Sequence, residues 1–298
     1  MKTIVCLAPC LMQENTRKIN KSSLDRNITT LVPDDYVLYD QCFEDNDYDS
    51  RFKYIAHAKK KMGFVGPRNA LLNWFYDSDY DYALWIDANS VVSRPTLNDI
   101  RTIMELLRQD RLPDCDAIFA SLGMWGCTDR IRAKSAEDYF QKIHLLPTKN
   151  NCSWNWMHGL IHVNYKKKYN QRFLIDERCN VNEGTAEDVT FARTIQRFSN
   201  CWVCPTVVIN KPSVSFSTHQ ADNGKYAYPP TLFDKIDDYI LETAEKNNYQ
   251  HVNPNLSRKE IVLDRNEDFK DLMRPYRPKE PKKSKIPDLK GRTNLFEL

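Results

Sequence analysis

The sequence predicts an α/β protein with a mainly parallel sheet and helices on both of its faces. One observation points to this class, and a second indicates a large buried core. Short apolar runs alternate along the chain with segments of helical composition, which is typical of parallel strands joined by helices. The 298 residues are 41% hydrophobic and 28% charged, so the chain can bury a large core without disulfide bonds.

The alternation places each element in turn. The expected strands are short apolar runs: Thr3–Ala8, Tyr36–Phe43, Tyr82–Ile86, Asp116–Leu122, Gly159–Asn164 and Trp202–Ile209. The expected helices are Thr16–Leu31, Gly66–Asp77, Asn98–Arg108 and Glu187–Phe198. Proline suits the start of the second helix, because its missing N–H is not needed in a first turn. Between Ser135 and Trp156 no clear period is visible.

The composition changes after Pro212. Leu232–Lys246 and Arg258–Met273 are expected to be surface helices, and the tail after Arg274 is rich in proline and lysine and predicted to be extended. We therefore divide the chain into a catalytic domain, residues 1–225, and a helical extension with a basic tail, residues 226–298.

The cysteines and the apolar runs indicate a cytoplasmic protein without a membrane partner. Nine cysteines form no disulfide framework, and the lone pair Cys201 and Cys204 lies in an apolar run, so buried thiols are expected rather than a zinc site. No apolar run approaches the roughly 18 residues of a membrane span. Met1–Met12 is interpreted as a buried first strand rather than a signal peptide.

The clearest chemical signal follows the strand Tyr82–Ile86. Asp87 and Asn89 bring two oxygen side chains to the carboxyl end of this strand, where open α/β sheets bind ligands. Hard cations such as Mn²⁺ and Mg²⁺ prefer such oxygen ligands and bridge nucleotide phosphates. A turn that simply ends a strand would account for the same residues.

Polar residues in two helical first turns add to this signal. Arg68 and Asn69 can meet an anionic or polar ligand, helped by free backbone N–H groups, although a surface salt bridge is an alternative for Arg68. Glu187 and Asp188 open a later helix, where a carboxylate serves either as a general base or as a helix cap.

A loop after the expected last strand contains a further pair. His219 is a candidate third metal ligand, and Lys225 can hold a diphosphate as a point charge. Solvated loop residues would have the same appearance.

Taken in this order, residues Lys2–Lys225 resemble the GT-A glycosyltransferases. The run from Trp85 to Val92 is similar to the DxD strand of that family, with Asn89 in place of the second Asp. An amide oxygen ligates a hard ion without bringing charge, so weaker metal affinity is expected. The resemblance implies a GT-A fold and Mn²⁺ or Mg²⁺ held by Asp87, Asn89 and His219.

The resemblance also implies a nucleoside-diphosphate sugar donor, commonly linked to UDP. The first strand up to Pro9 would flank the nucleotide, and Asp40 ends the second strand where the family often reads uracil. Arg68, Asn69 and Lys225 would hold the nucleotide diphosphate.

The catalytic carboxylate is expected on the acceptor side. Glu187-Asp188 resembles the pair of inverting members, in which the Asp is the base. The series His219, Gly224 and Lys225 resembles retaining members, so the stereochemistry stays open.

The acceptor is suggested by charge alone. Basic residues cluster at Lys59–Lys61, at Lys166–Lys168 and in the tail, and such clusters bind phosphate backbones in a salt-sensitive way. In style the chain is similar to the DNA-modifying glycosyltransferases of T-even-like bacteriophages, which implies double-stranded DNA with hydroxymethylated cytosine as acceptor. Open alternatives are a polysaccharide or lipid-linked acceptor, a nucleotidyltransferase, and a non-catalytic nucleic-acid-binding protein.

Overall fold

A computed structural model describes residues 1–10, 26–27, 29–40, 54–57, 65–87, 91–121, 141–148, 157, 159–179, 187–210 and 230–264. The strands are β1 (Ile4–Cys10), β2 (Asp35–Asp40), β3 (Tyr54–His57), β4 (Tyr82–Trp85), β5 (Val91–Val92), β6 (Ala117–Ser121), β7 (Lys142–Pro147), β8 (Ile161–Val163), β9 (Cys201–Asn210) and β10 (Ile261–Asp264). The helices are α2 (Val65–Asp77), α3 (Arg94–Arg108), α5 (Tyr165–Tyr169), α6 (Glu187–Phe198) and α7 (Pro230–Lys246), with the 3₁₀ turn η2 (Glu177–Cys179).

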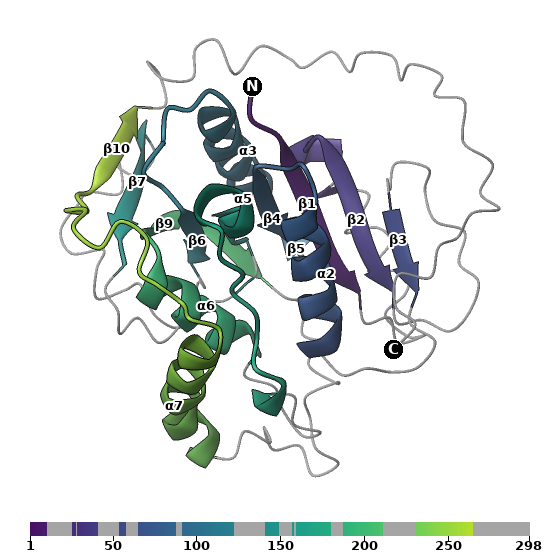
Figure 1. Ribbon diagram of the computed structural model, residues 1–298. Coiled ribbons are helices and arrows are strands. Elements are labelled where there is room, and N and C mark those ends of the chain that lie inside the picture. The colour runs from purple at the N-terminus through teal and green to yellow at the C-terminus, as the bar shows by residue number, and fades with distance from the viewer. Residues whose placement is uncertain are drawn as a thin grey trace.

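All the described strands belong to one sheet with the order β10-β7-β9-β6-β8-β4-β1-β2-β3, and β5 pairs with β9 (Figure 1). β1 pairs in parallel with β2 and β4, β2 with β3, and β6 with β9. β8 runs antiparallel between β4 and β6, and β7, β10 and β5 are also antiparallel to their partners. Most paired residues lie in parallel ladders, so the predicted α/β class with a mainly parallel sheet is confirmed.

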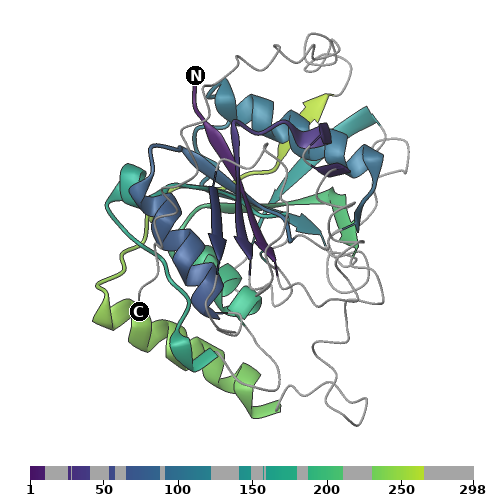
Figure 2. The same ribbon diagram turned by 90° about the vertical axis from the view of Figure 1, so that its right-hand side faces the viewer.

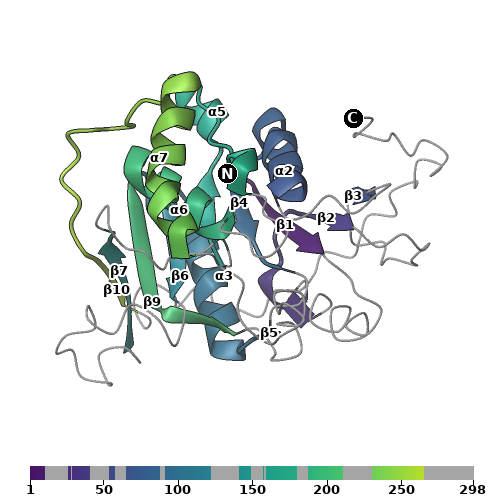
Figure 3. The ribbon, with the colours of Figure 1, turned by 90° about the horizontal axis from the view of Figure 1, so that it is seen from below.

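Helices cover both faces of this sheet. α2, α5, α6 and α7 lie on one side, and α3 lies on the other, as the views in Figures 2 and 3 agree. α3 is amphipathic and begins at Ser93, whose hydroxyl accepts a hydrogen bond from the Thr96 N–H. The buried side chains of both layers and of the central strands form a single core cluster. In the described part of the chain, no helix has the length and apolar character needed to cross a membrane.

Most predicted elements appear with small shifts of their ends. The helix predicted at Glu187–Phe198 has those bounds, and the helix predicted from Gly66 begins one residue earlier. Of the helix predicted for Thr16–Leu31, only 26–27 and 29–31 are described, and they are helical. Cys201 and Cys204 are buried free thiols, and burial raises the pKa of Cys204 to about 11.

The prediction of a surface helix over Arg258–Met273 is wrong in its described part. Ile261–Asp264 forms β10, which pairs with β7 and buries Leu263. β9 is therefore not the last strand. The apolar triplet of β10 is stabilised by a partner about 120 residues away in the chain, a contact that local helical periodicity does not reveal. The short strands β3, β5 and β7 were not predicted.

The described part of the predicted extension packs with the preceding residues. Ile236, Ile240 and Ala244 of α7 belong to the same core cluster as the sheet, and β10 adds an edge strand to it. The boundary after residue 225 stays a prediction, but residues 230–264 share the core of the first segment.

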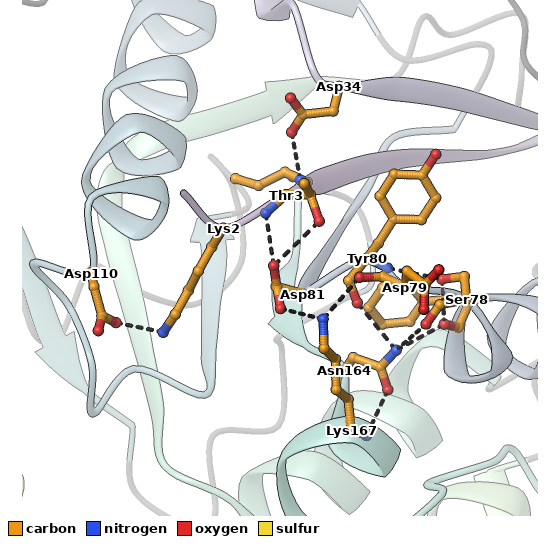
Figure 4. A network of polar contacts seen from close by, with 12 residues as sticks. Lys2, Thr3, Asp34, Ser78, Asp79, Tyr80, Asp81, Asp110, Asn164 and Lys167 are labelled. Atoms are coloured by element: carbon orange, nitrogen blue, oxygen red, sulfur yellow. Dashed lines mark hydrogen bonds and ion pairs between the residues drawn. The ribbon is translucent and has the colours of Figure 1, made fainter.

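Charged and amide side chains fasten the amino ends of the central strands. Asp81, just before β4, accepts hydrogen bonds from the Thr3 N–H at 2.9 Å and from Lys167 Nζ at 2.7 Å (Figure 4). Asn164 accepts from the Lys167 N–H at the start of α5 and donates to the carbonyls of Phe75 and Tyr80. α5 is thereby held against the end of α2 and the start of β4.

The other two lysines of α5 also have acidic partners. Lys166 pairs with Asp77, and Lys168 Nζ lies 2.8 Å from Oδ1 of the fully buried Asp116. The predicted basic cluster Lys166–Lys168 is therefore neutralised by carboxylates at the amino ends of the strands.

A buried histidine lies at the centre of the core. His162 of β8 accepts a hydrogen bond at Nε2 from the Trp85 indole at 2.8 Å, and its Nδ1–H donates to the Val163 carbonyl at 2.9 Å. Its ring stacks on Tyr165. Burial lowers the pKa of His162 to about 4, so the folded protein holds this ring neutral.

We predict that His162 contributes to acid sensitivity. In the unfolded chain a histidine has a pKa of about 6.5, so the unfolded state binds the proton first as pH falls. The free energy of unfolding should decrease from about pH 6.5 to about pH 4, by roughly 3 kcal/mol from this residue. Urea unfolding across this range should show a flatter dependence for His162→Gln than for wild type. His251→Gln, at an exposed position, should not flatten it, and equal slopes for His162→Gln and wild type would contradict the assignment.

Candidate active site

The carboxyl ends of three neighbouring parallel strands bring predicted site residues to one edge of the sheet. Cys10, one residue after Pro9, is paired with Asp40 at the end of β2, and Leu7 of β1 is paired with Trp85 of β4. Asp87 follows β4 by two residues and is only 8% exposed. The backbone positions of Pro9 and Asp40 therefore lie on the same edge as Asp87, which is the edge where open α/β sheets bind ligands.

Helix α2 carries Arg68 into this edge. Arg68 shares the buried face of the helix with Leu71, Leu72 and Phe75, three, four and seven residues further on. This spacing turns the arginine toward the sheet, and the side chain is only 5% exposed. The alternative of a surface salt bridge is therefore wrong for Arg68.

Three carboxylates surround the Arg68 guanidinium. Nη2 lies 2.9 Å from Asp188 Oδ1 and 3.5 Å from Asp87 Oδ1, and Nε lies 3.4 Å from Glu187 Oε1. These carboxylates come from two elements, the end of β4 and the start of α6. One arginine thus joins Asp87 to the predicted acceptor-side pair.

Glu187 and Asp188 are both buried in the first turn of α6. The partial positive charge of a helix N-terminus favours acidic residues there. Burying two adjacent carboxylates still requires compensation by cations or donors, and Arg68 supplies part of it. The packing of α6 on the sheet and the ionic contacts of its first turn depend on each other.

The segment before β8 closes the site from a further side. Met157 is fully buried, and its Sδ lies 3.8 Å from Arg68 Nη1. Gly159, at a φ of 70° that favours glycine, donates to the Trp85 carbonyl at 2.7 Å. This turn carries the chain across the end of β4, and no pattern in the sequence had indicated Met157.

The carboxylates around Arg68 stabilise the charged form of its guanidinium. Burial lowers the pKa of Arg68, but Asp188, Asp87 and Glu187 outweigh it and leave that pKa above its usual range. Arg68 is thus a permanent cation. Three carboxylates thus face this one guanidinium.

Asn69 points to a different partner from Arg68. Its Nδ2 donates to the Ile175 carbonyl at 2.8 Å, and its Oδ1 accepts from the Ile175 N–H at 2.9 Å. Both hydrogen-bonding groups of the amide are used by one backbone residue just before η2. Contact of Asn69 with a nucleotide stays a prediction.

The remaining predicted ligands, Asn89, His219 and Lys225, lie outside the described residues. Within the described ranges, no group of three or more His, Cys, Asp or Glu side chains is arranged to hold a metal ion. The reason is visible at Asp87, Glu187 and Asp188, since the guanidinium of Arg68 lies among their oxygens. The described carboxylates therefore do not form a metal site by themselves.

Comparisons with known proteins were made for sequence and structure. No protein-family model and no curated protein matches the sequence. Similar solved structures include residues 1–349 of S. aureus TarS, with a TM-score of 0.48, 14% identity and coverage of 83% of this chain and 72% of that one. TarS 1–349 in complex with UDP-GlcNAc aligns with a TM-score of 0.47 and 13% identity over 90% and 75%. A mycobacterial protein aligns with a TM-score of 0.45 and 11% identity over 88% and 84%.

We predict that Arg68→Met destabilises the protein strongly. Removing one partner of a buried ion pair leaves uncompensated charge inside the protein, at a cost of about 3–5 kcal/mol. Arg68→Lys keeps the charge but loses the planar fork, so it should lower the free energy of unfolding by less than Arg68→Met does. Urea unfolding of both variants measures these free energies.

Arg193→Met is the matched control for this prediction. Arg193 lies on α6, as Glu187 and Asp188 do, and its partner Asp237 is 62% exposed, so loss of this ion pair should cost at most about 1 kcal/mol. Equal losses for Arg68→Met and Arg193→Met would show that the central cluster does not hold the site together.

Proposed function

We propose that the chain is a nucleotide-sugar-dependent glycosyltransferase of the GT-A type. The single observation that supports this best is the meeting of Asp87 with Glu187 and Asp188 across Arg68. Asp87, which we assign to the phosphate side, meets Glu187 and Asp188, which we assign to the acceptor side, at the edge where β1, β2 and β4 end. A transfer between two bound substrates requires such groups within reach of one another.

In this proposal the two sides of the site have different tasks. The ends of β1 and β2, with Pro9 and Asp40, flank the nucleoside, and Asp87 and Lys225 face the diphosphate. Asp188 takes the proton from the acceptor hydroxyl as a general base, with Glu187 beside it. The ion pair with Arg68 compensates the negative charge of ionised Asp188 inside the protein.

The proposal also includes a divalent metal ion. Asp87 would hold Mn²⁺ or Mg²⁺ together with Asn89 and His219, of which only Asp87 is described. Asp87 and Asn89 would offer the oxygen atoms that these ions prefer, and His219 would add an imidazole nitrogen. A divalent ion there would neutralise charge on the diphosphate leaving group.

The proposed acceptor is double-stranded DNA with hydroxymethylated cytosine. Of the three predicted basic clusters, one is engaged in ion pairs within the protein. Lys166–Lys168 have acidic partners near the amino ends of β4 and β6, opposite the edge that carries Asp87. The other two predicted basic clusters, Lys59–Lys61 and the tail, lie outside the described residues, and we assign DNA binding to them.

We predict donor turnover that requires both acids. Wild-type protein with Mn²⁺ is incubated with a panel of nucleoside-diphosphate sugars, with and without hydroxymethylated DNA, and free nucleoside diphosphate is measured. Asp188→Asn should reduce transfer by roughly 10²- to 10⁴-fold with little change in nucleotide affinity, because only the proton acceptor is lost. Asp87→Asn should weaken metal-dependent nucleotide binding as well.

Asp81→Asn is the matched control, because Asp81 precedes β4 as Asp87 follows it. It should leave turnover per folded molecule unchanged. Release that does not respond to DNA would keep the glycosyltransferase and exclude the proposed acceptor. No turnover of any donor, together with no metal-dependent nucleotide binding, would overturn the proposal itself.

We also predict where DNA binding resides. Neutral substitutions at Lys59–Lys61 should weaken DNA binding and reduce its salt dependence, because lysines that contact phosphates release counterions from DNA. The same substitutions at Lys166–Lys168 should lower the melting temperature and leave the salt dependence unchanged. Electrophoretic mobility shifts at several salt concentrations, beside thermal unfolding, separate the two clusters. The reverse pattern would show that the ion pairs of α5 open to bind DNA.

A further inference from the structure

The segment of residues 171–179, which follows α5 and ends with η2, runs beside α2 (Figure 2). Its residues meet the helix in antiparallel order. Three contacts have this order: Arg172 with Asn73 and Asp77, the Phe173 carbonyl with the Tyr76 hydroxyl, and Ile175 with Asn69. The helix thus carries a row of polar side chains that fixes the path of the segment.

The contact of Asn69 differs from the others in this row. Its amide makes two bonds to the backbone of a single residue, Ile175, as a neighbouring strand would do. Two bonds to one peptide unit fix orientation as well as position. Asn69 directly follows Arg68 on α2, so neighbouring residues of one helix contact the Ile175 backbone and the carboxylates of the site.

From Ile175 the segment leads to the first turn of α6. η2 ends at Cys179, whose Sγ lies 3.3 Å from Thr190 Oγ1, and both side chains are buried. Thr190 lies two residues after Asp188 on the same helix. Arg68 reaches Asp188 directly at 2.9 Å. α2 therefore holds the start of α6 at two points, through Arg68 and through the path Asn69, Ile175, Cys179.

We propose that Asn69 is a positioning residue for the catalytic carboxylates. It holds Ile175 and, through Cys179, the side chain of Thr190, and it thereby sets the placement of Glu187 and Asp188 relative to Asp87. This inference rests on the proposed function. In this inference Asn69 holds the backbone of Ile175 rather than the nucleotide, and its Nδ2 also donates to Glu177 Oε1 at 3.4 Å.

The test compares Asn69→Ala with Asn73→Ala. Asn73 belongs to the same row, but among the described residues it accepts its hydrogen bond from the side chain of Arg172, which also pairs with Asp77. For each variant, kcat of transfer, the Kd of the free donor nucleotide and the melting temperature are measured. Asn69→Ala should lower kcat by about ten- to a hundredfold with an unchanged Kd, because small displacements of reacting groups are costly. Asn73→Ala should change neither kcat nor Kd.

The outcomes separate the roles. A weaker nucleotide Kd in Asn69→Ala with unchanged kcat would show ligand contact, and unchanged values of both would show a structural role only. Either result overturns the inference while wild-type turnover keeps the proposed function. If wild type turns over no donor, this inference fails, and the proposed function fails as well if metal-dependent nucleotide binding is also absent. If Asn69→Ala does not fold, Asn69→Asp, which keeps the acceptor for the Ile175 N–H and loses the donor to the Ile175 carbonyl, should still lower kcat at unchanged Kd.

Discussion

The burial of the Arg68 guanidinium is the constraint on which the rest of the site depends. A buried cation is tolerated only with nearby anions and acceptors, and here they come from the end of β4 and the start of α6. α2 cannot pack its apolar face on the sheet without bringing this charge along. The packing of the helices on the sheet and the placement of the carboxylates therefore depend on each other. Such a cluster adds little net stability, but breaking it is costly, so it selects one arrangement of α2 and α6 over others.

Ion pairs fasten both ends of the parallel strands, and each end uses the cations of a different helix. At the amino ends, Asp81 and Asp116 pair with lysines of α5 and bind backbone N–H groups of neighbouring elements. At the carboxyl end of β4, Asp87 and the two acids that open α6 lie around Arg68 of α2. α5 is thus bound at the amino ends of the strands, and α2 is bound at the carboxyl end of β4.

Much of the fold could be predicted because the central strands and helices have strong local signals. Buried parallel strands such as β1 and β4 are apolar throughout, and α6 has both acids at its start and an amphipathic body. β10 could not be predicted, since four residues have no periodicity of their own and their partner β7 lies in an irregular stretch. The burial of Arg68 could have been found, because it shares a helical face with Leu71, Leu72 and Phe75. Met157 could not, because a turn through Gly159 brings it to the site.

By itself, the sequence determined the class of fold and the edge on which the polar residues gather. Both follow from local rules: periodicity sets the elements, and the ends of parallel strands share one side of a sheet. Only the tertiary structure decided what these residues do to one another. Two adjacent residues, Arg68 and Asn69, look like a pair of ligand contacts in the sequence. In the folded chain one joins three carboxylates, and the other holds the backbone of Ile175. Successive residues of a helix point about 100° apart, and their partners lie about 20 to 120 residues away, so no local pattern specifies them.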